Sequence, residues 1–282
     1  MGESIRIIIL ACALAFTLQT SKAATVLAPG SIVAGQSIAN WTAGWWTRFW
    51  QAPVSSIDPA TGNVAANVNN NAPVFYGPTT SGDLSLGHVT ISFTVPHGRP
   101  LLVPLLPFDD LEAASIDGGA SLADRESAAS IVVAGWLTSV DPASLFATID
   151  GTAVSNPSSY LEETGFFSAG PAQPGSIAAS GGVTVGDDLY PNEAAGYWLM
   201  IDGLSLGEHT VEFGGSSDVF TPDSNCCTNF PFGPYNVDVT ANIDVVPEPS
   251  TALLTLAGII GLIAFRSRPA THVSNEPSCS GQ

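Results

Sequence analysis

The sequence predicts a mainly β protein: a β-sandwich, jelly-roll-like or immunoglobulin-like, with one N-terminal aromatic helix and one further helix. Three observations favour this class. Short runs of alternating apolar and polar residues recur along the chain, as in half-buried strands. Glycine, proline and asparagine separate these runs, as expected of turns. Only two segments of the body carry the apolar spacing of helices, so packed sheets rather than alternating strands and helices are expected.

The first predicted element of the body is an aromatic helix from Ser37 to Gln51. Ser37 is a suitable N-cap, and Pro53 ends the segment. Five large aromatic residues share one helix face: Trp41, Trp45, Trp46, Phe49 and Trp50. We expect this face to pack on the sheet, because aromatic residues at helical spacing usually point inward. The alternative is a platform that stacks on sugar rings through its four tryptophans: Trp41, Trp45, Trp46 and Trp50.

Two strands are predicted next, followed by an acid-rich segment. His88 to Val95 alternates with the period of a half-buried strand. Leu101 to Leu106 is a nearly continuous apolar run, and Pro104 within it indicates an edge or bulged strand. Asp109 and Asp110 then open the densest acid cluster of the chain. A pocket that combines them with the tryptophans of the first helix is the best candidate cleft, although we assign no site to it.

The second helix is predicted from Ser121 to Leu137. Its expected buried positions are Leu122, Ile131, Val132 and Trp136. The acidic residues at its start lie where the helix dipole favours negative charge, which explains them without a ligand.

From Leu145 onward the pattern is β. Leu145 to Ile149 leads into Asp150-Gly151, a strong two-residue hairpin turn. Tyr197 to Ile201 and Thr210 to Phe213 are expected to form a second hairpin.

Two further segments complete the body. Ser168 to Gly186 is rich in glycine, alanine, serine and proline, and we predict a long, mobile loop there. Tyr235 to Val245 alternates and is predicted as the final strand.

The charge of the chain excludes some partners. The formal net charge is −18 at pH 7, and the body has no lysine and only three basic residues, Arg48, Arg99 and Arg125. A basic patch cannot be built from them, so nucleic acid is not an expected partner. The acidic residues lack the spacing of a calcium loop, and we predict neither a metal nor a cofactor.

No catalytic residue is predicted. We recognise no Gly-x-Ser-x-Gly nucleophile elbow and no His-Glu-x-x-His motif. The body histidines, His88, His97 and His209, are interpreted as surface or turn residues. The expected protein is therefore not an enzyme.

Both ends of the chain are predicted to carry targeting signals. Residues 1–23 form a signal peptide, with Arg6 before an apolar segment and Ser21-Lys22-Ala23 as the peptidase site, so cleavage is expected after Ala23. At the other end, Val246-Pro247-Glu248-Pro249 precedes an apolar run that ends before Arg266 and Arg268. As a helix this run reaches only about 24 Å, against a hydrocarbon core of about 30 Å.

Residues 246–268 resemble the PEP-CTERM sorting signal of Gram-negative bacteria, because prolines, an acid, an apolar run and arginines follow in that order. The resemblance implies processing by a membrane-embedded exosortase and delivery to the cell surface or an exopolysaccharide matrix. The chain departs from it by continuing for fourteen residues after Arg268, a segment (269–282) expected to be cytoplasmic. An ordinary single-span anchor that is never cut is the alternative.

The body, residues 24–245, is similar to an uncharacterised family of exported bacterial β-rich proteins. The similar segments include Trp45-Trp46, Val95-Pro96, Gly196-Tyr197-Trp198 and Gly207-Glu208-His209-Thr210. This resemblance implies an architecture and no catalytic residue.

We therefore expect an exported, non-enzymatic protein of the cell surface or extracellular matrix. It would be anchored transiently by a C-terminal helix, after removal of the N-terminal signal helix. The expected partners are a signal peptidase and an exosortase-like enzyme, with exopolysaccharide as a candidate ligand. A carbohydrate-binding module is the first alternative, and a polysaccharide-active hydrolase is the second.

Overall fold

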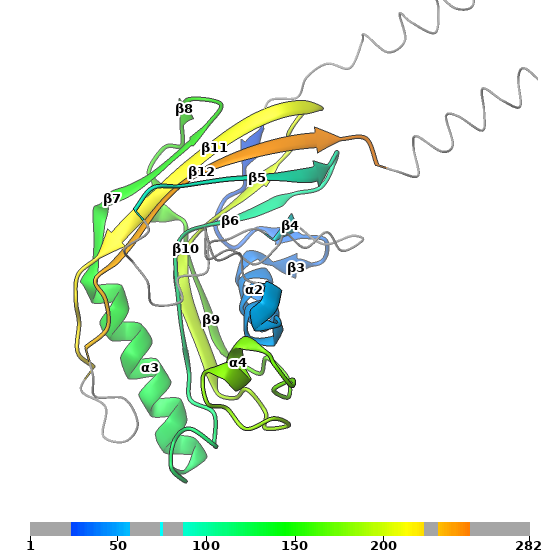
Figure 1. Ribbon diagram of the computed structural model, residues 1–282. Coiled ribbons are helices and arrows are strands. Elements are labelled where there is room, and N and C mark those ends of the chain that lie inside the picture. The colour runs from blue at the N-terminus through cyan, green and yellow to red at the C-terminus, as the bar shows by residue number, and fades with distance from the viewer. Residues whose placement is uncertain (1–23, 57–73, 76–86, 223–230, 249–282) are drawn as a thin grey trace, which may run out of the picture. The chain divides into compact units, whose positions relative to one another are not determined.

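A computed structural model describes residues 24–56, 74–75, 87–222 and 231–248 (Figure 1). The predicted signal peptide with Ala23, and the sorting-signal residues Pro249, Arg266 and Arg268, lie outside these ranges. One compact unit of the chain ends at Val246. None of the helices within the described ranges is both long and apolar enough to cross a membrane.

Two five-stranded sheets form the body, which is mainly β and sandwich-like, as predicted. The first sheet has the order β1-β10-β6-β4, and β9 pairs with β10 as well. Its strands are β1 (Thr25–Val26), β4 (Val74–Phe75), β6 (Leu101–Leu111), β9 (Leu161–Phe167) and β10 (Asn192–Asp202). The second sheet has the order β5-β12-β11-β7-β8. Its strands are β5 (Val89–Pro96), β7 (Val140–Ile149), β8 (Thr152–Ala153), β11 (Gly207–Ser217) and β12 (Tyr235–Val246).

Shorter elements complete the fold. A two-stranded ribbon joins β2 (Ile32–Val33) to β3 (Gln36–Ser37). Within the described ranges, the α-helices are α2 (Ile38–Gln51), α3 (Leu122–Ser139) and the single turn α4 (Ile177–Ser180). Two 3-10 turns are η1 (Val54–Ser56) and η3 (Pro157–Ser159).

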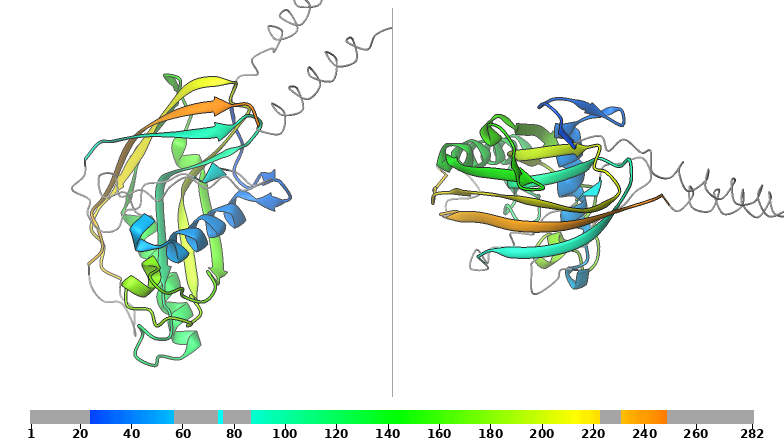
Figure 2. Two further views of the ribbon diagram at one scale, coloured as in Figure 1. Left: turned by 45° about the vertical axis from the view of Figure 1, so that its right-hand side comes forward. Right: turned by 90° about the horizontal axis from the view of Figure 1, so that it is seen from above.

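The first sheet is the middle layer, because both of its faces are covered. Along β10, Tyr197 and Leu199 pack into the core shared with the second sheet and α3, whereas Trp198 and Met200 pack with the helix α2. Successive side chains of a strand point to opposite faces, so this alternation puts α2 on the face away from α3 (Figure 2). Strands covered on both faces read as nearly continuous apolar runs, which explains the sequences of β6 and β10.

The helix α2 is the predicted aromatic helix. Ser37 caps it, and its hydroxyl accepts a hydrogen bond from the backbone N–H of Asn40 at 3.2 Å. Trp45 and Trp46 are 6% and 5% exposed, and Trp45 stacks on Phe49 with ring centroids 5.9 Å apart. The expected inward packing of the aromatic face is therefore confirmed for these residues.

The strand β6 is longer than predicted and contains the expected bulge. Its pairing with β10 shifts register so that Leu105 is passed over between Pro104 and Leu106. The paired strand continues to Leu111, so Asp109 and Asp110 lie within it.

The helix α3 begins one residue after the predicted start, with Ser121 as its N-cap, and two of its four expected core residues are wrong. Val132 and Trp136 are fully buried, whereas Ile131 is only partly buried and Leu122 is 46% exposed. Leu122 is the first residue of the helix and precedes its first buried residue, Ala128, so it extends beyond the packed face.

The predicted hairpin at Asp150-Gly151 is confirmed, since both residues have positive φ (51° and 73°) and join β7 to β8. The second predicted hairpin is wrong. Residues 197–201 belong to β10 in the first sheet and residues 210–213 to β11 in the second. Because β6 and β9 occupy both edges of β10 along most of its length, β11 pairs instead with β7 and β12.

Of the last two predictions, the final strand is confirmed, and the long loop is confirmed only as a largely irregular segment. In β12 the apolar residues alternate inward, and Val237, Val239 and Ile243 are buried. The segment 168–186 is mostly irregular, but it contains α4 and a small apolar core that includes Ala172, Ala178 and Val183.

A candidate functional site: a Ser–His–Asp network beside a pocket

A short chain segment that crosses between the sheets ends at a polar network. The strand β10 ends at Asp202, and residues 203–206 lead to β11 in the other sheet. Ser205 lies in this crossing, and His209 lies near the start of β11. The hairpin turn after the neighbouring strand β7 brings Asp150 to the same place. Ile149 is paired with Val211 of β11, and the backbone N–H of Asp150 donates a hydrogen bond to the Thr210 oxygen.

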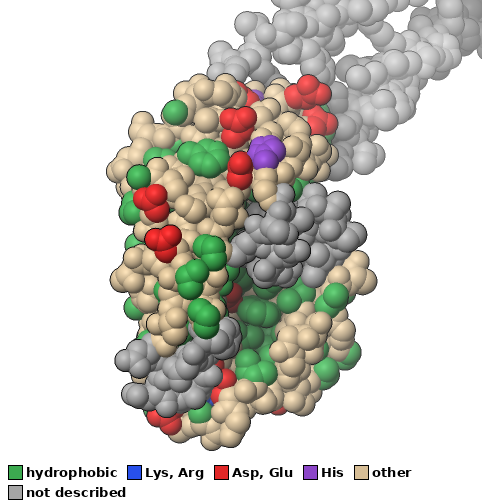
Figure 3. Space-filling model, turned by 60° about the vertical axis from the view of Figure 1, so that its left-hand side comes forward, with side chains coloured by type: hydrophobic (Ala, Val, Ile, Leu, Met, Phe, Trp, Pro, Cys, Tyr) green, Lys and Arg blue, Asp and Glu red, His purple; other side chains and the backbone are tan. Residues whose placement is uncertain are grey.

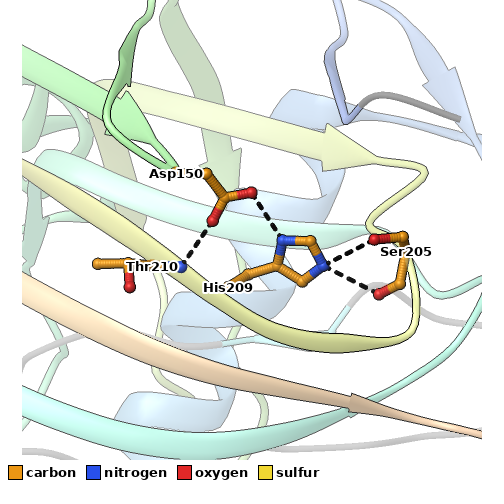
Figure 4. A network of polar contacts seen from close by, with 4 residues as sticks. All are labelled: Asp150, Ser205, His209 and Thr210. Atoms are coloured by element: carbon orange, nitrogen blue, oxygen red, sulfur yellow. Dashed lines mark hydrogen bonds and ion pairs between the residues drawn. The ribbon is translucent and has the colours of Figure 1, made fainter. Parts of the chain in front are cut away.

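The three side chains form a continuous hydrogen-bonded row (Figure 4). His209 Nδ1 lies 2.8 Å from Asp150 Oδ2, and His209 Nε2 lies 3.2 Å from Ser205 Oγ. The other oxygen of Asp150, Oδ1, accepts a hydrogen bond from the backbone N–H of Thr210 at 2.9 Å. The carboxylate is thus held at both oxygens, and it orients the imidazole ring toward Ser205.

The protonation of His209 decides what this row does. Nε2 also lies 3.0 Å from the backbone oxygen of Ser205. A proton on Nε2 is donated to that oxygen, and the network then acts as a clamp on the crossing segment. Without that proton, the Nε2 lone pair accepts a hydrogen bond from the Ser205 hydroxyl instead.

Burial and charge in this network are compatible with a carboxylate that stays ionised. Partial burial acts to raise the pKa of Asp150, but the hydrogen bonds from Thr210 and His209 outweigh it, and the pKa lies below its ordinary value. The side chain of His209 is 11% exposed and that of Asp150 is 49% exposed, so the imidazole ring is largely buried and the carboxylate lies at the surface.

A pocket of about 470 Å³ adjoins the row. Besides the three polar residues, its walls include Val26, Val154 and Tyr160. No lysine or arginine lines it among the described residues. A pocket of this size holds a small organic group.

No family model, curated protein or solved structure matches the chain. Functional inferences about this protein therefore rest on its own residues.

The sequence contains a signal for this network that our prediction missed. Gly203-Leu204-Ser205-Leu206-Gly207 has the Gly-x-Ser-x-Gly spacing, so the expectation that the chain lacks this motif was wrong. In a nucleophile elbow a helix follows the serine. Here the strand β11 follows it. The prediction of His209 as a turn residue described its place in the chain, but not its contacts with Asp150 and Ser205.

The carboxyl groups at the end of β6 form a second polar region. Here the structure brings together Asp109 and Trp50, two residues that the candidate cleft predicted from the sequence combines. Trp50 Nε1 donates a hydrogen bond to Asp109 Oδ2 at 2.6 Å. Burial raises the pKa of Asp109 to about 7, although the contacts with Trp50 and Asn192 favour its ionised form. The side chain of Asn192 is fully buried near this carboxyl group, but neither its Nδ2 nor its Oδ1 has a hydrogen-bond partner of ordinary geometry among the described residues.

Asp110 points to the opposite face of the strand. It is 8% exposed, and burial raises its pKa to about 7. A hydrogen bond with Glu112 opposes this rise, whereas the negative charges of Asp109, Asp117 and Glu193 add to it. Figure 3 shows one face of the molecule with a hollow in which hydrophobic side chains gather, with acidic ones beside them.

This pair of carboxyl groups does not have the arrangement of a glycoside hydrolase. That mechanism needs two carboxyl groups about 5 to 9 Å apart on either side of one glycosidic bond. Asp109 and Asp110 are neighbours on a strand, so their side chains point to opposite faces of the sheet. Their burial makes them sensitive to pH rather than suited to act on one bond together.

The remaining predicted site residues fall into separate places. Trp45 and Trp46 are buried in the core with Trp198, so the alternative of a sugar-stacking platform is wrong for these two residues. Trp41 is partly buried, and its Nε1 donates to the backbone oxygen of Val33 at 2.8 Å. Trp50 also is partly buried, with its Nε1 engaged by Asp109.

Two other predictions concern ligands and sorting. In the described part of the chain, no group of three or more His, Cys, Asp or Glu residues could hold a metal ion. Of the sorting motif, Val246 is the last residue of β12, and Pro247 and Glu248 follow it without regular structure.

Proposed function

We propose that this protein is an exported component of the cell surface or extracellular matrix, delivered by its C-terminal sorting signal. The observation that carries the proposal is the order of residues in the tail. Val246-Pro247-Glu248-Pro249 is followed by an apolar run that, as a helix, is shorter than the hydrocarbon core of a bilayer, and then by Arg266 and Arg268.

The position of the fold boundary supports this proposal. The strand β12 is paired up to Val246, which lies opposite Pro96 of β5, and the backbone N–H of His97 donates to the Val246 oxygen at 2.7 Å. The compact unit ends at the same residue. Cleavage after Val246 would therefore remove no strand or core residue from that unit.

The surface of the second sheet also suits an extracellular location. Its outward residues on β5 and β12 are polar, including Thr90, Ser92, Asn242 and Asp244. With no lysine in the body and a strongly negative charge, copies of the protein repel one another and stay soluble.

The test is the intact mass of the protein made from the full chain in a Gram-negative host, with and without an exosortase. We expect an N-terminus at Ala24 and, only with the exosortase, loss of the segment after the sorting motif. Replacing Pro247 and Pro249 by alanine should prevent the C-terminal cleavage, whereas Asp244→Asn, just outside the motif, should leave it unchanged. Membrane-embedded protein that keeps Gln282 in the presence of the exosortase would contradict the proposal.

A further inference from the structure

The arrangement of Ser205, His209 and Asp150 satisfies the geometric requirements for an activated nucleophile. Such a site needs a hydroxyl group within hydrogen-bond reach of a base, and a third group that orients the base. The Oγ–Nε2 distance of 3.2 Å and the Nδ1–Oδ2 distance of 2.8 Å meet both conditions. The N–H of Thr210, which binds the other carboxylate oxygen, fixes the orienting group in turn.

The location of the serine supports a chemical role in addition to a structural one. Ser205 is only partly buried and faces the 470 Å³ pocket together with His209 and Asp150. A clamp on the crossing segment requires the backbone oxygen of Ser205, but it does not require the hydroxyl group or an adjoining space. Ser205 lies in the short irregular segment between β10 and β11, and it is partly exposed there.

We propose that Ser205 is the nucleophile of an acyl-transfer site, with His209 as its general base and Asp150 as the residue that orients the base. The site would act on an uncharged ester with a short acyl group. The walls formed by Val26, Val154 and Tyr160 favour an apolar acyl group, and the lack of a lysine or arginine among the described lining residues offers nothing to an anionic substrate.

The reaction balances with water as the second substrate. Ser205 Oγ bonds to the ester carbonyl carbon while its proton passes to His209 Nε2, and the alcohol leaves with that proton when the C–O bond breaks. Water then attacks the acyl-serine, again losing a proton to Nε2. The carboxylic acid departs, and the proton returns to Ser205 Oγ.

The ester has two possible sources: a free small molecule, or an O-acetyl group carried on a neutral sugar. Only the second source rests on the proposed surface location. The acyl-transfer chemistry itself does not depend on where the protein is delivered.

The test uses the purified full chain at about pH 8, because general-base catalysis by an imidazole requires its neutral form. The first measurement is covalent labelling by a fluorophosphonate, located by peptide mass spectrometry. We expect the label on Ser205, its loss in Ser205→Ala, and no change in Ser92→Ala, which alters an exposed serine on the outer face of β5. Absence of label on Ser205 in the natural chain would overturn the proposal.

The second measurement is hydrolysis of 4-nitrophenyl acetate and of an acetylated glucose. We expect Ser205→Ala to reduce the rate about a hundredfold or more, and Asp150→Asn to reduce kcat more than it raises KM. Hydrolysis of the nitrophenyl ester alone supports the site and assigns it to free small esters, whereas hydrolysis of both extends it to acetylated sugars. Equal rates for the natural chain and Ser205→Ala would refute it, whatever the outcome of the sorting experiment.

Discussion

Asp110→Asn should stabilise the protein in neutral and mildly alkaline solution and leave its stability in acid nearly unchanged. Asp110 is 8% exposed, and burial raises its pKa from an ordinary value of 3.8 to about 7. The charges that act on it, those of Asp109, Asp117 and Glu193, are all negative. The folded protein therefore holds this carboxyl group in its neutral form over a pH range in which the unfolded chain has already lost the proton.

The sign and size of the effect follow from proton linkage. Below about pH 4 both states are protonated, so the group has no effect on the free energy of unfolding. As the pH rises toward 7, only the unfolded chain ionises, and the folded state loses stability until its own carboxyl group ionises. The difference between 3.8 and about 7 corresponds to an upper limit of about 4 kcal/mol, at about 1.4 kcal/mol per pH unit. Asparagine is neutral throughout and should avoid this loss.

The assay is urea unfolding of the natural chain and of the variant between about pH 4 and pH 8, followed by tryptophan fluorescence. The matched control is Asp244→Asn, which neutralises an exposed carboxylate on the outer face of β12. We expect the Asp110 variant to gain stability relative to the natural chain as the pH rises, and the control to show no such trend. If the two variants responded equally to pH, the burial of Asp110 would not have the assigned effect.

Two further substitutions test the packing. Trp45→Ala should lower the free energy of unfolding by about 3 to 5 kcal/mol, because Trp45 is buried against Trp46, Phe49 and Trp198. Thermal unfolding measures this loss. An unchanged melting temperature would mean that this ring is not part of the core. Gly214→Ala should destabilise the protein by at least about 3 kcal/mol in urea unfolding, because its Cβ would collide with the rigid backbone oxygen of Val237. Gly215→Ala meets only the flexible end of Leu145 and should be tolerated better, so the reverse order would contradict the described pairing of β11 and β12.

The parts of the fold that could be predicted are those set by nearby residues. The aromatic helix follows from a serine cap, a repeated spacing and a terminating proline, which all lie within seventeen residues. The turn at Asp150-Gly151 and the alternation of β12 are equally local, because side-chain direction in a strand depends only on position along it. The mainly β class follows from several such elements together.

The errors arose where the partner of an element is distant in sequence. Two adjacent strand-like segments usually form a hairpin, but both edges of β10 are occupied by β6 and β9, so β11 joins the other sheet. The contact between Trp50 and Asp109 spans 59 positions, and the sequence could name both residues but not bring them together. Asn192 is not among the residues predicted from the sequence, although a polar residue at the start of a largely apolar strand is a visible signal.

By itself, the sequence predicted the two longer helices and several of the strands, and it determined the negative charge of the body. Only the tertiary structure decided which sheet each strand joins, and with it the meeting of Ser205 and His209 with Asp150 more than fifty residues earlier in the chain. The physical reason is that cross-strand pairing depends on which edges remain free once the core has packed. That information is not carried by any local pattern of residues.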